Sequence, residues 1–245
     1  MAALHDGGLS TRKMVLITAR HRTDNAPALR AMYDALFVRF GPQHWWPART
    51  RFEIIVGAIL TQNTAWTNVE KALVKLRRER ALTPQAMHGV PTATLANWIR
   101  SAGYYTIKAR RLHSFTGWLM SEYGGSLNRM FKTPTAELRK QLLSVNGIGR
   151  ETADCILLYA GQRPIFVVDA YTRRALKHLG WIEGDEDYDE IAALFMKQLP
   201  ADEKLFNEFH ALIVQLGKWY CRTRPQCEQC PLRAFLPRAT AARGA

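Results

Sequence analysis

The stretch from residue 133 to residue 157 most constrains the fold of this chain, because it predicts two helices separated by only a few residues. A threonine–proline pair at 133–134 is typical of a helix start, and Asn146-Gly147 is typical of a helix end. Apolar residues recur at helical spacing on both sides of the break: Leu138, Leu142, Val145, Ala153, Ile156 and Leu157. Because this pattern resumes just after Gly149, the sequence predicts two helices joined by a hairpin whose two glycines tolerate positive φ.

The hairpin predicts a binding site for an anion. Backbone N–H groups face outward at such a turn, and the start of the second helix adds the positive end of its dipole. A phosphate group can therefore bind there without a charged side chain. The same Gly-x-Gly pattern also serves as a simple helix cap and turn, so the hairpin by itself leaves both interpretations open.

The charge of the chain favours a polyanionic partner. Its 245 residues include 34 Lys and Arg against 21 Asp and Glu, a net charge of +13. Nucleic acid is the leading candidate, although solvated basic surfaces are common. No apolar run reaches the roughly 18 residues that a membrane span needs, so no membrane partner is expected. Four cysteines, three of them near the C-terminal end, suit a reducing compartment and predict a cytoplasmic protein.

Helical spacing of apolar residues continues through most of the chain, which predicts an all-α fold in one large or two small domains. Residues 26–40 are one such amphipathic segment, and a glycine–proline pair ends it. On a later helix, Lys108, Arg110 and Arg111 lie on the face expected to be exposed. These three side chains either reach phosphates or are simply solvated.

A short apolar run from Ile165 to Val168 follows the hairpin and ends in Asp169. The run has no partner strand and helical periods surround it, so we expect an extended connector rather than a strand. Asp169 is then positioned to cap the helix that follows. A capping role alone is the simplest interpretation of this aspartate.

Taken together, these features resemble a known family. The hairpin, the Asp169 segment and the upstream run LTQNT at 60–64 occur in the order found in the helix-hairpin-helix DNA glycosylases of the endonuclease III superfamily. The resemblance extends from about residue 42 to residue 231. Within it, the sequence WWP at 45–47 is similar to the base pocket of the 3-methyladenine DNA glycosylases related to endonuclease III.

The resemblance implies an all-α DNA glycosylase fold in two helical parts, with a DNA-binding cleft between them. A central helical bundle from 50 to 163 ends in the helix-hairpin-helix. Residues 23–49 and 164–236 form a terminal helical domain that carries the catalytic aspartate and a cysteine-rich loop. Residues 1–22 are expected to be a flexible basic extension, and residues 237–245 a frayed tail.

The resemblance also implies roles for single residues. Asp169 faces the sugar of a flipped nucleotide, where its charge stabilises the oxocarbenium-like transition state of glycosidic cleavage. Gln62, with Asn63 beside it, enters the minor groove and fills the gap left by that nucleotide. Aromatic residues stack on the flipped base, although two adjacent tryptophans also fill a protein core well. The residues expected to contact DNA at the hairpin are Asn146, Gly147, Ile148, Gly149, Arg150 and Thr152, and those expected to line the base pocket are Trp45, Trp46 and Pro47.

Glu151 is the informative departure from the family. Bifunctional members such as endonuclease III have at this position a lysine that attacks the sugar, forms a Schiff base and leads to strand cleavage. Glutamate cannot form an imine, and Arg150 cannot replace the lysine because a guanidinium stays protonated at neutral pH. The site is therefore expected to be monofunctional, with water as the nucleophile. Glu151 itself suits a structural role in the first turn of the second helix.

Cys221, Cys227 and Cys230 resemble the [4Fe-4S] loop of the family, which has four cysteines spaced C-x6-C-x2-C-x5-C. The spacing here is C-x5-C-x2-C, and Leu236 occupies the fourth position. A cluster requires four thiolates, and Cys155 on the second hairpin helix is badly placed to supply the missing one. Two outcomes stay open, a loop that packs without iron and a cluster with a ligand other than cysteine. Catalysis requires no cofactor in either case.

The sequence thus predicts a monofunctional DNA glycosylase of base excision repair that acts on a flipped damaged base. Alkylated purines such as 3-methyladenine are the expected substrates, and the expected partner is damaged double-stranded DNA, bound by a monomer at the nucleoid. One alternative is a bifunctional endonuclease III-like glycosylase and abasic-site lyase for oxidised pyrimidines, against which Glu151 argues. The other is a non-enzymatic DNA-binding protein that kept the hairpin, against which Asp169 argues.

Overall fold

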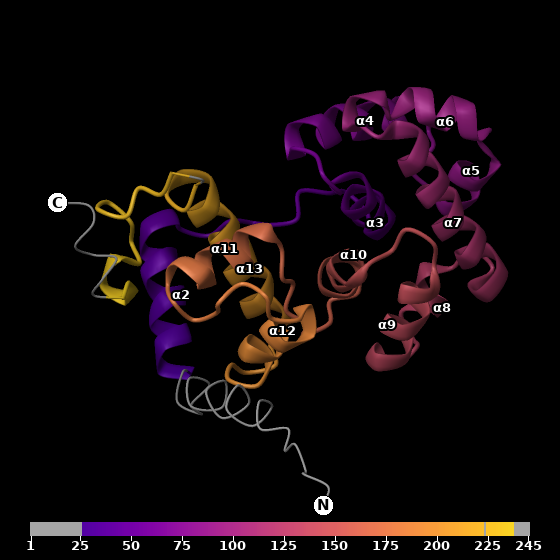
Figure 1. The fold of residues 1–245 in the computed structure, drawn as a ribbon. Coiled ribbons are helices and arrows are strands. Elements are labelled where there is room, and N and C mark those ends of the chain that lie inside the picture. Colours follow the sequence, from indigo (N-terminus) through magenta and orange to yellow (C-terminus); the bar gives the residue numbers. More distant parts are fainter. Residues whose placement is uncertain (1–25, 223, 238–245) are drawn as a thin grey trace, which may run out of the picture. The chain divides into compact units, whose positions relative to one another are not determined.

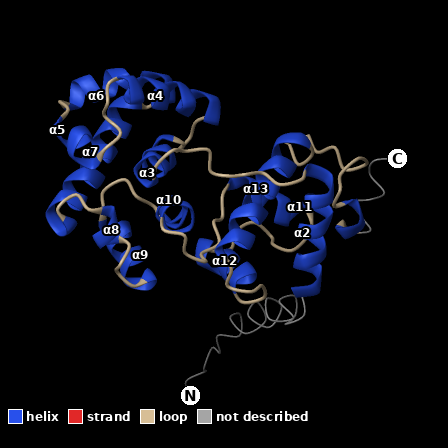
Figure 2. Cartoon of the chain, turned by 180° about the vertical axis from the view of Figure 1, so that it is seen from behind, coloured by secondary structure: helices blue, strands red, loops and turns tan. Residues whose placement is uncertain are grey.

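The computed structural model describes residues 26–222 and 224–237, and every regular element in these ranges is helical (Figure 1) (Figure 2). The all-α prediction is therefore confirmed. In the same ranges, no helix has both the length and the apolar character that crossing a membrane requires. The predicted extension at residues 1–22 and nearly all of the predicted tail lie outside the described residues.

Short connections join most of the helices. The α-helices are α2 (Ala26–Phe40), α3 (Arg51–Leu60), α4 (Trp66–Arg78), α5 (Pro84–Gly89), α6 (Thr92–Trp98), α7 (Tyr105–Tyr123), α8 (Leu127–Met130), α9 (Thr135–Ser144), α10 (Arg150–Cys155), α11 (Ala170–His178), α12 (Tyr188–Met196) and α13 (Glu203–Trp219). Two 3-10 turns, η1 (Arg100–Ala102) and η3 (Arg233–Phe235), and one π-helical turn, η2 (Ile156–Ala160), complete the elements.

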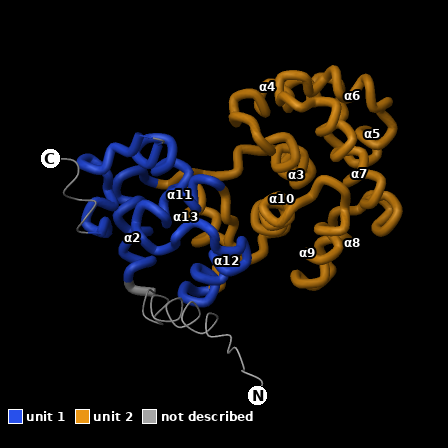
Figure 3. Tube along the Cα trace, viewed as in Figure 1, with its two compact units in different colours: residues 1–41, 170–200, 212–245 blue, residues 42–169, 201–211 orange. Residues whose placement is uncertain are grey.

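The chain forms two compact units (Figure 3). Unit 1 consists of Met1–Gly41, Ala170–Pro200 and Leu212–Ala245, and unit 2 consists of Pro42–Asp169 and Ala201–Ala211. The whole of the expected central bundle lies in unit 2. The tryptophan pair at 45–46 and the first half of α13 also belong to unit 2, as does Asp169.

In unit 1, close helix packing positions the cysteine-rich loop. Gly217 of α13 lets α11 approach closely, because an added Cβ would lie 2.2 Å from the Tyr171 ring. Arg174 of α11 donates a hydrogen bond from Nε to the backbone carbonyl of Cys221. The start of the cysteine loop is therefore held against α11.

In unit 2, α3 is the central buried helix. Its N-cap Thr50 accepts a hydrogen bond from the backbone N–H of Glu53, and residues 55–60 of the helix are all buried. A helix that is apolar on every side must be surrounded by other elements. Four elements pack against α3, namely α4, α7, α10 and η2. This helix therefore fixes the position of the segment that follows the predicted hairpin.

Lys108 on α7 is buried, which corrects the expectation of an exposed side chain. It is 1% exposed, and Nζ donates hydrogen bonds to the carbonyl oxygens of Leu60 (2.8 Å) and Ala102 (2.7 Å). These carbonyls end α3 and η1 and lack hydrogen-bond donors within their own helices. Burial, together with the charge of Arg111, lowers the pKa of Lys108 to about 8. The lysine is thus a buried cap for two helix ends.

Lys108→Met should lower the free energy of unfolding by roughly 1 to 3 kcal/mol, because two buried carbonyls lose their donor while the apolar stem is retained. Urea unfolding at neutral pH measures this difference. Arg110→Met is the matched control, since Arg110 is exposed on the same helix, and it should change stability little. Equal losses in the two variants would contradict the capping role.

Candidate functional site

The predicted hairpin is present between α9 and α10. The first helix ends at Ser144 and the second begins at Arg150. Within the loop, the backbone N–H of Ile148 donates to the carbonyl of Val145 at 3.0 Å, which closes a tight turn. The prediction of two helices joined by a short hairpin is confirmed.

Gly147 is the residue that the hairpin requires to be glycine. It has φ of +87°, whereas Gly149, the N-cap of α10, has an ordinary φ of −90°. A Cβ on residue 147 would also lie 2.2 Å from Cγ of Arg111, and no atom lies within 4 Å of a Cβ built on residue 149. Both the backbone conformation and the close approach of Arg111 therefore exclude a side chain at position 147.

A buried ion pair joins the two helices of the hairpin. Arg139 on α9 donates from Nε and Nη2 to the two carboxylate oxygens of Asp154 on α10, at 2.7 and 2.9 Å. Asp154 is 1% exposed. Such a two-point contact fixes orientation as well as distance, and loss of either partner would leave a buried charge without compensation. The pair therefore sets the geometry of α9 against α10.

Gln62 contacts the hairpin directly. Its Nε2 donates to the carbonyl of Gly147 (3.0 Å) and to Oγ1 of Thr152 (2.8 Å), and its Oε1 accepts from Arg111. The structure thus brings together two motifs that lie far apart in the sequence. The neighbouring Asn63 is exposed, with φ of +53°.

The residues expected to contact DNA at the hairpin differ in exposure. Asn146, Gly149 and Arg150 are exposed, whereas Ile148 (4%) and Thr152 (5%) are buried. Ile148 supports the loop by packing beneath it, and Thr152 supports it by accepting the hydrogen bond from Gln62. The exposed residues form the outer surface of the hairpin.

Four aromatic side chains form one cluster in unit 2, which we call the aromatic cluster: Trp45, Trp46, Trp66 and Tyr159. The Trp46 ring centroid lies 5.1 Å from those of Trp45 and Trp66 and 5.0 Å from that of Tyr159. Trp46 also packs closely on α3, because a Cβ on Gly57 would lie 3.2 Å from its ring. The adjacent Pro47 is exposed.

Three indole N–H groups of the aromatic cluster are buried hydrogen-bond donors. Among the described residues, none provides a hydrogen-bond partner for Nε1 of Trp45, Trp46 or Trp66, although all three atoms are buried. Buried donors of this kind are usually bonded in proteins. A polar ring bound at the cluster could accept from them while it stacks on the aromatic faces.

Asp169 is linked to this aromatic cluster through a histidine. It ends the connector, whose residues 166–168 are buried and form no regular structure, as predicted, and it directly precedes α11. Its Oδ2 lies 3.5 Å from Nε2 of His210 on α13. Nδ1 of the same imidazole shares a hydrogen bond of 2.5 Å with the Tyr159 hydroxyl. The Asp169 side chain remains 14% exposed, so it is held by its neighbours without being sealed from solvent.

Comparison with known proteins identifies the arrangement. Residues 56–201 match the profile of the HhH-GPD superfamily of base excision DNA repair proteins, where HhH denotes helix-hairpin-helix. The chain belongs to this superfamily.

Similar proteins agree with this assignment. A protein of Methanocaldococcus jannaschii named "Putative DNA repair glycosylase MJ1434" is 47% identical over 206 residues, which cover 83% of this chain and 93% of that protein. A non-covalent endonuclease III–DNA complex has a TM-score of 0.75 at 27% identity, covering 89% of this chain and 98% of that one. The 3-methyladenine DNA glycosylase of H. pylori, bound to 1,N6-ethenoadenine, has a TM-score of 0.69 at 31% identity and covers 80% and 97%. The resemblance inferred from the motifs is confirmed.

Glu151 of this glycosylase is exposed in the first turn of α10, where its charge interacts favourably with the helix N-terminus. Cys155, on the same helix, is buried. Burial raises the pKa of its thiol well above the usual value, and the nearby charge of Glu151 adds to this effect. Cys155 does not line the pocket of the other three cysteines.

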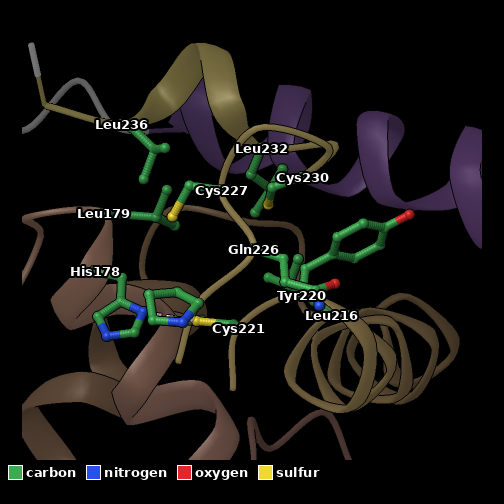
Figure 4. Close-up of a pocket in the computed structure, with 12 residues that line it drawn as sticks. His178, Leu179, Leu216, Tyr220, Cys221, Gln226, Cys227, Cys230, Leu232 and Leu236 are labelled. Carbon is green, nitrogen blue, oxygen red and sulfur yellow. Dashed lines mark hydrogen bonds between the residues drawn. The ribbon is translucent and has the colours of Figure 1, made fainter. Parts of the chain in front are cut away.

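Those three cysteines line one pocket in unit 1 together with His178 and Leu236 (Figure 4). Burial raises the pKa of Cys221 to about 11 and also raises the pKa of Cys230. Nδ1 of His178 lies 3.0 Å from Sγ of Cys221, so these two side chains are hydrogen-bonded to each other.

The donors at this pocket do not fit a four-thiolate iron–sulfur cluster. Leu236 lines the pocket from the position of the fourth cysteine and has no ligating atom. Over the part of the chain that the structure describes, no group of three or more His, Cys, Asp or Glu side chains is arranged to hold a metal ion. The cysteine loop therefore enters no step of the function proposed below.

Sequence reasoning missed three residues of the site. None of the sequence motifs singles out Trp66, Tyr159 or His210. The sequence signal is weak, because Trp66 only begins an amphipathic helix, whereas Tyr159 and His210 each interrupt an apolar helical run. His210 and Tyr159 are 51 residues apart, and only the packing of α13 on η2 brings them together.

Gly147→Ala should weaken duplex DNA binding and destabilise the protein by about 1 to 3 kcal/mol, because both the positive φ and Arg111 oppose a Cβ. Fluorescence anisotropy with a labelled duplex and thermal unfolding measure the two effects. Gly149→Ala is the control for the unfolding measurement, since its backbone and its surroundings within the protein accept a methyl group. If the two alanine variants unfolded at the same temperature, the hairpin would not depend on Gly147.

Proposed function

We propose that this protein is a monofunctional DNA glycosylase that hydrolyses the N-glycosidic bond of a flipped, alkylated purine such as 3-methyladenine. The observation that carries the proposal is the chain of contacts from Trp46 through Tyr159 and His210 to Asp169. It joins a stacking surface to a partly exposed carboxylate within one structural unit. A glycosylase needs both features side by side, one for the base and one for the sugar.

The chemistry follows from the charge of Asp169. Breaking an N-glycosidic bond develops positive charge on the sugar, and a fixed carboxylate stabilises that charge and orients the attacking water. The base must first leave the helix, because a duplex hides the bond from any side chain. In this proposal Gln62, already bonded to the hairpin, fills the vacated space, and the hairpin holds the phosphates nearby.

Alkylated purines suit this site for an electrostatic reason. Alkylation at N3 of adenine or N7 of guanine makes the base cationic and weakens its bond to the sugar, so little protonation of the leaving base is needed. A cationic ring also gains roughly 0.5 to 2 kcal/mol by stacking on an aromatic face. The similarity to the H. pylori 3-methyladenine DNA glycosylase supports the same substrate class.

Glu151 supports a reaction without strand cleavage. A lyase step requires an amine that forms a Schiff base with the sugar, and a carboxylate cannot do so. Water is then the nucleophile, and the product is an intact strand with an abasic site.

Borohydride should trap no covalent adduct between the wild-type protein and DNA during base release, and strand breaks should appear only after alkaline treatment. Glu151→Lys should produce a trapped adduct, because it restores an amine at the start of α10. Gel electrophoresis of the borohydride-treated mixtures reads out both results. Robust trapping by the wild-type protein would instead favour the bifunctional lyase.

Asp169→Asn should lower the single-turnover rate of 3-methyladenine release on the order of 10² to 10³-fold, because the shape is kept and the charge is lost. Binding to an undamaged duplex should persist. The assay is a panel of duplexes, each with one lesion, in which released base and strand breaks are scored separately.

Asp187→Asn is the matched control, since Asp187 is an exposed helix N-cap in unit 1 and asparagine also caps well. It should leave the rate unchanged. Near-full activity of Asp169→Asn would refute the mechanism. Faster release of uncharged oxidised pyrimidines than of 3-methyladenine would refute the substrate assignment.

A further inference from the structure

We propose that His210 is a positioning residue that fixes the orientation of the Asp169 carboxylate, with Tyr159 holding the imidazole in place. The proposal rests on the function proposed above, because that function gives Asp169 its role. It assigns a task to two buried polar side chains that no motif of the sequence identified.

Two contacts join the three side chains through the His210 ring. The Tyr159 hydroxyl bonds to Nδ1 of His210 at 2.5 Å, and Nε2 on the opposite side of the ring faces Oδ2 of Asp169 at 3.5 Å. Contacts of catalytic groups are commonly longer in a free enzyme than in its substrate complex. The separation therefore suits an N–H that closes on the carboxylate when the site is occupied.

The carboxylate selects the tautomer of the imidazole. If Nε2 were bare, its lone pair would face the lone pairs of Asp169, which is repulsive. A proton on Nε2 removes this conflict, and in the neutral ring it leaves Nδ1 as the acceptor for the Tyr159 hydroxyl. Asp169 thus imposes the arrangement in which His210 donates toward the carboxylate, and the Tyr159 hydroxyl, which can donate or accept, is compatible with it.

Packing alone does not account for a histidine at this position. The Phe166 ring centroid lies 6.5 Å from that of the imidazole, and the flanking residues Phe209 and Ala211 are buried. In such surroundings an apolar side chain avoids the desolvation cost that a buried imidazole carries. The His210 side chain is 7% exposed, and its Nε2 has no hydrogen bond to any described residue, so the Asp169 carboxylate is the charged group that it faces.

The consequence for the reaction is a fixed carboxylate. Held through Oδ2, the group keeps its Oδ1 in a constant direction toward the positive charge that develops on the sugar. Small displacements of a reacting group reduce rates steeply, by roughly 10²-fold for a shift of about 1 Å. A side chain that holds Asp169 therefore affects the rate of bond cleavage without contacting the base.

Two isosteric variants separate the two contacts of His210. Glutamine carries an amide N–H close to the position of Nε2 and can still donate to Asp169. Asparagine carries its amide close to the position of Nδ1 and can still bond Tyr159 but does not reach the carboxylate. The experiment measures the single-turnover rate of 3-methyladenine release, the affinity for an undamaged duplex, and the melting temperature of both variants.

His210→Gln should retain most of the wild-type rate, whereas His210→Asn should lose on the order of 10²-fold, with duplex affinity and melting temperature similar in the two. A merely structural histidine would give the opposite pattern, in which both variants lose stability and rate together. Equal rates for the two variants, whether high or low, would overturn the proposal.

Two further variants complete the test. His178→Gln makes the same chemical change at the histidine that bonds Cys221 in unit 1, and it should leave the rate unchanged. Tyr159→Phe keeps the ring in the aromatic cluster but removes the hydroxyl that bonds Nδ1 of His210. It should lower the rate of base release less than His210→Asn does.

Failure of this inference differs from failure of the proposed function. If the wild-type protein releases no base from any lesion, the function is wrong. If the wild-type protein is active and Asp169→Asn is inactive, but His210→Asn matches the wild-type rate, only the positioning role is wrong.

Discussion

The left-handed backbone at Gly147 is the constraint on which the rest of the site depends. Because residue 147 has no Cβ, Arg111 can cross the hairpin closely and bond Gln62, whose amide in turn holds the carbonyl of Gly147. The Arg139 pair with Asp154 then fixes the two helices on either side. A hairpin with these fixed contacts can present its exposed loop to a phosphate backbone without first becoming ordered.

Buried polar groups give unit 2 its specific arrangement. Lys108 bonds the carbonyl ends of two helical segments, Asp154 holds an arginine, and His210 links a tyrosine to Asp169. Each group would be costly in an apolar core without its partner. Helices whose contacts are purely apolar can repack with little penalty, whereas these three groups favour a single packing of the helices.

Local patterns determined much of the fold in advance. Periodic apolar residues placed the helices, and Asn146-Gly147 with Gly149 placed the hairpin, because the physics of helix ends operates within a few residues. The connector ending in Asp169 was predictable for the same reason. Long-range contacts were not predictable in this way. The end of α3, 48 residues away, covers the apparent solvent face of Lys108, and it leaves no mark in the sequence around the lysine.

The sequence by itself therefore determined the superfamily and the hairpin, and it marked Asp169 and Glu151 as candidate site residues, since each of these features lies in a motif of a few consecutive residues. Only the tertiary structure decided that Gln62 bonds the hairpin and that Trp66 joins the tryptophan pair. It also decided that His210 faces Asp169. These contacts join residues 20 to 85 positions apart. Helical periodicity specifies which face of a helix is buried but not which side chain it meets.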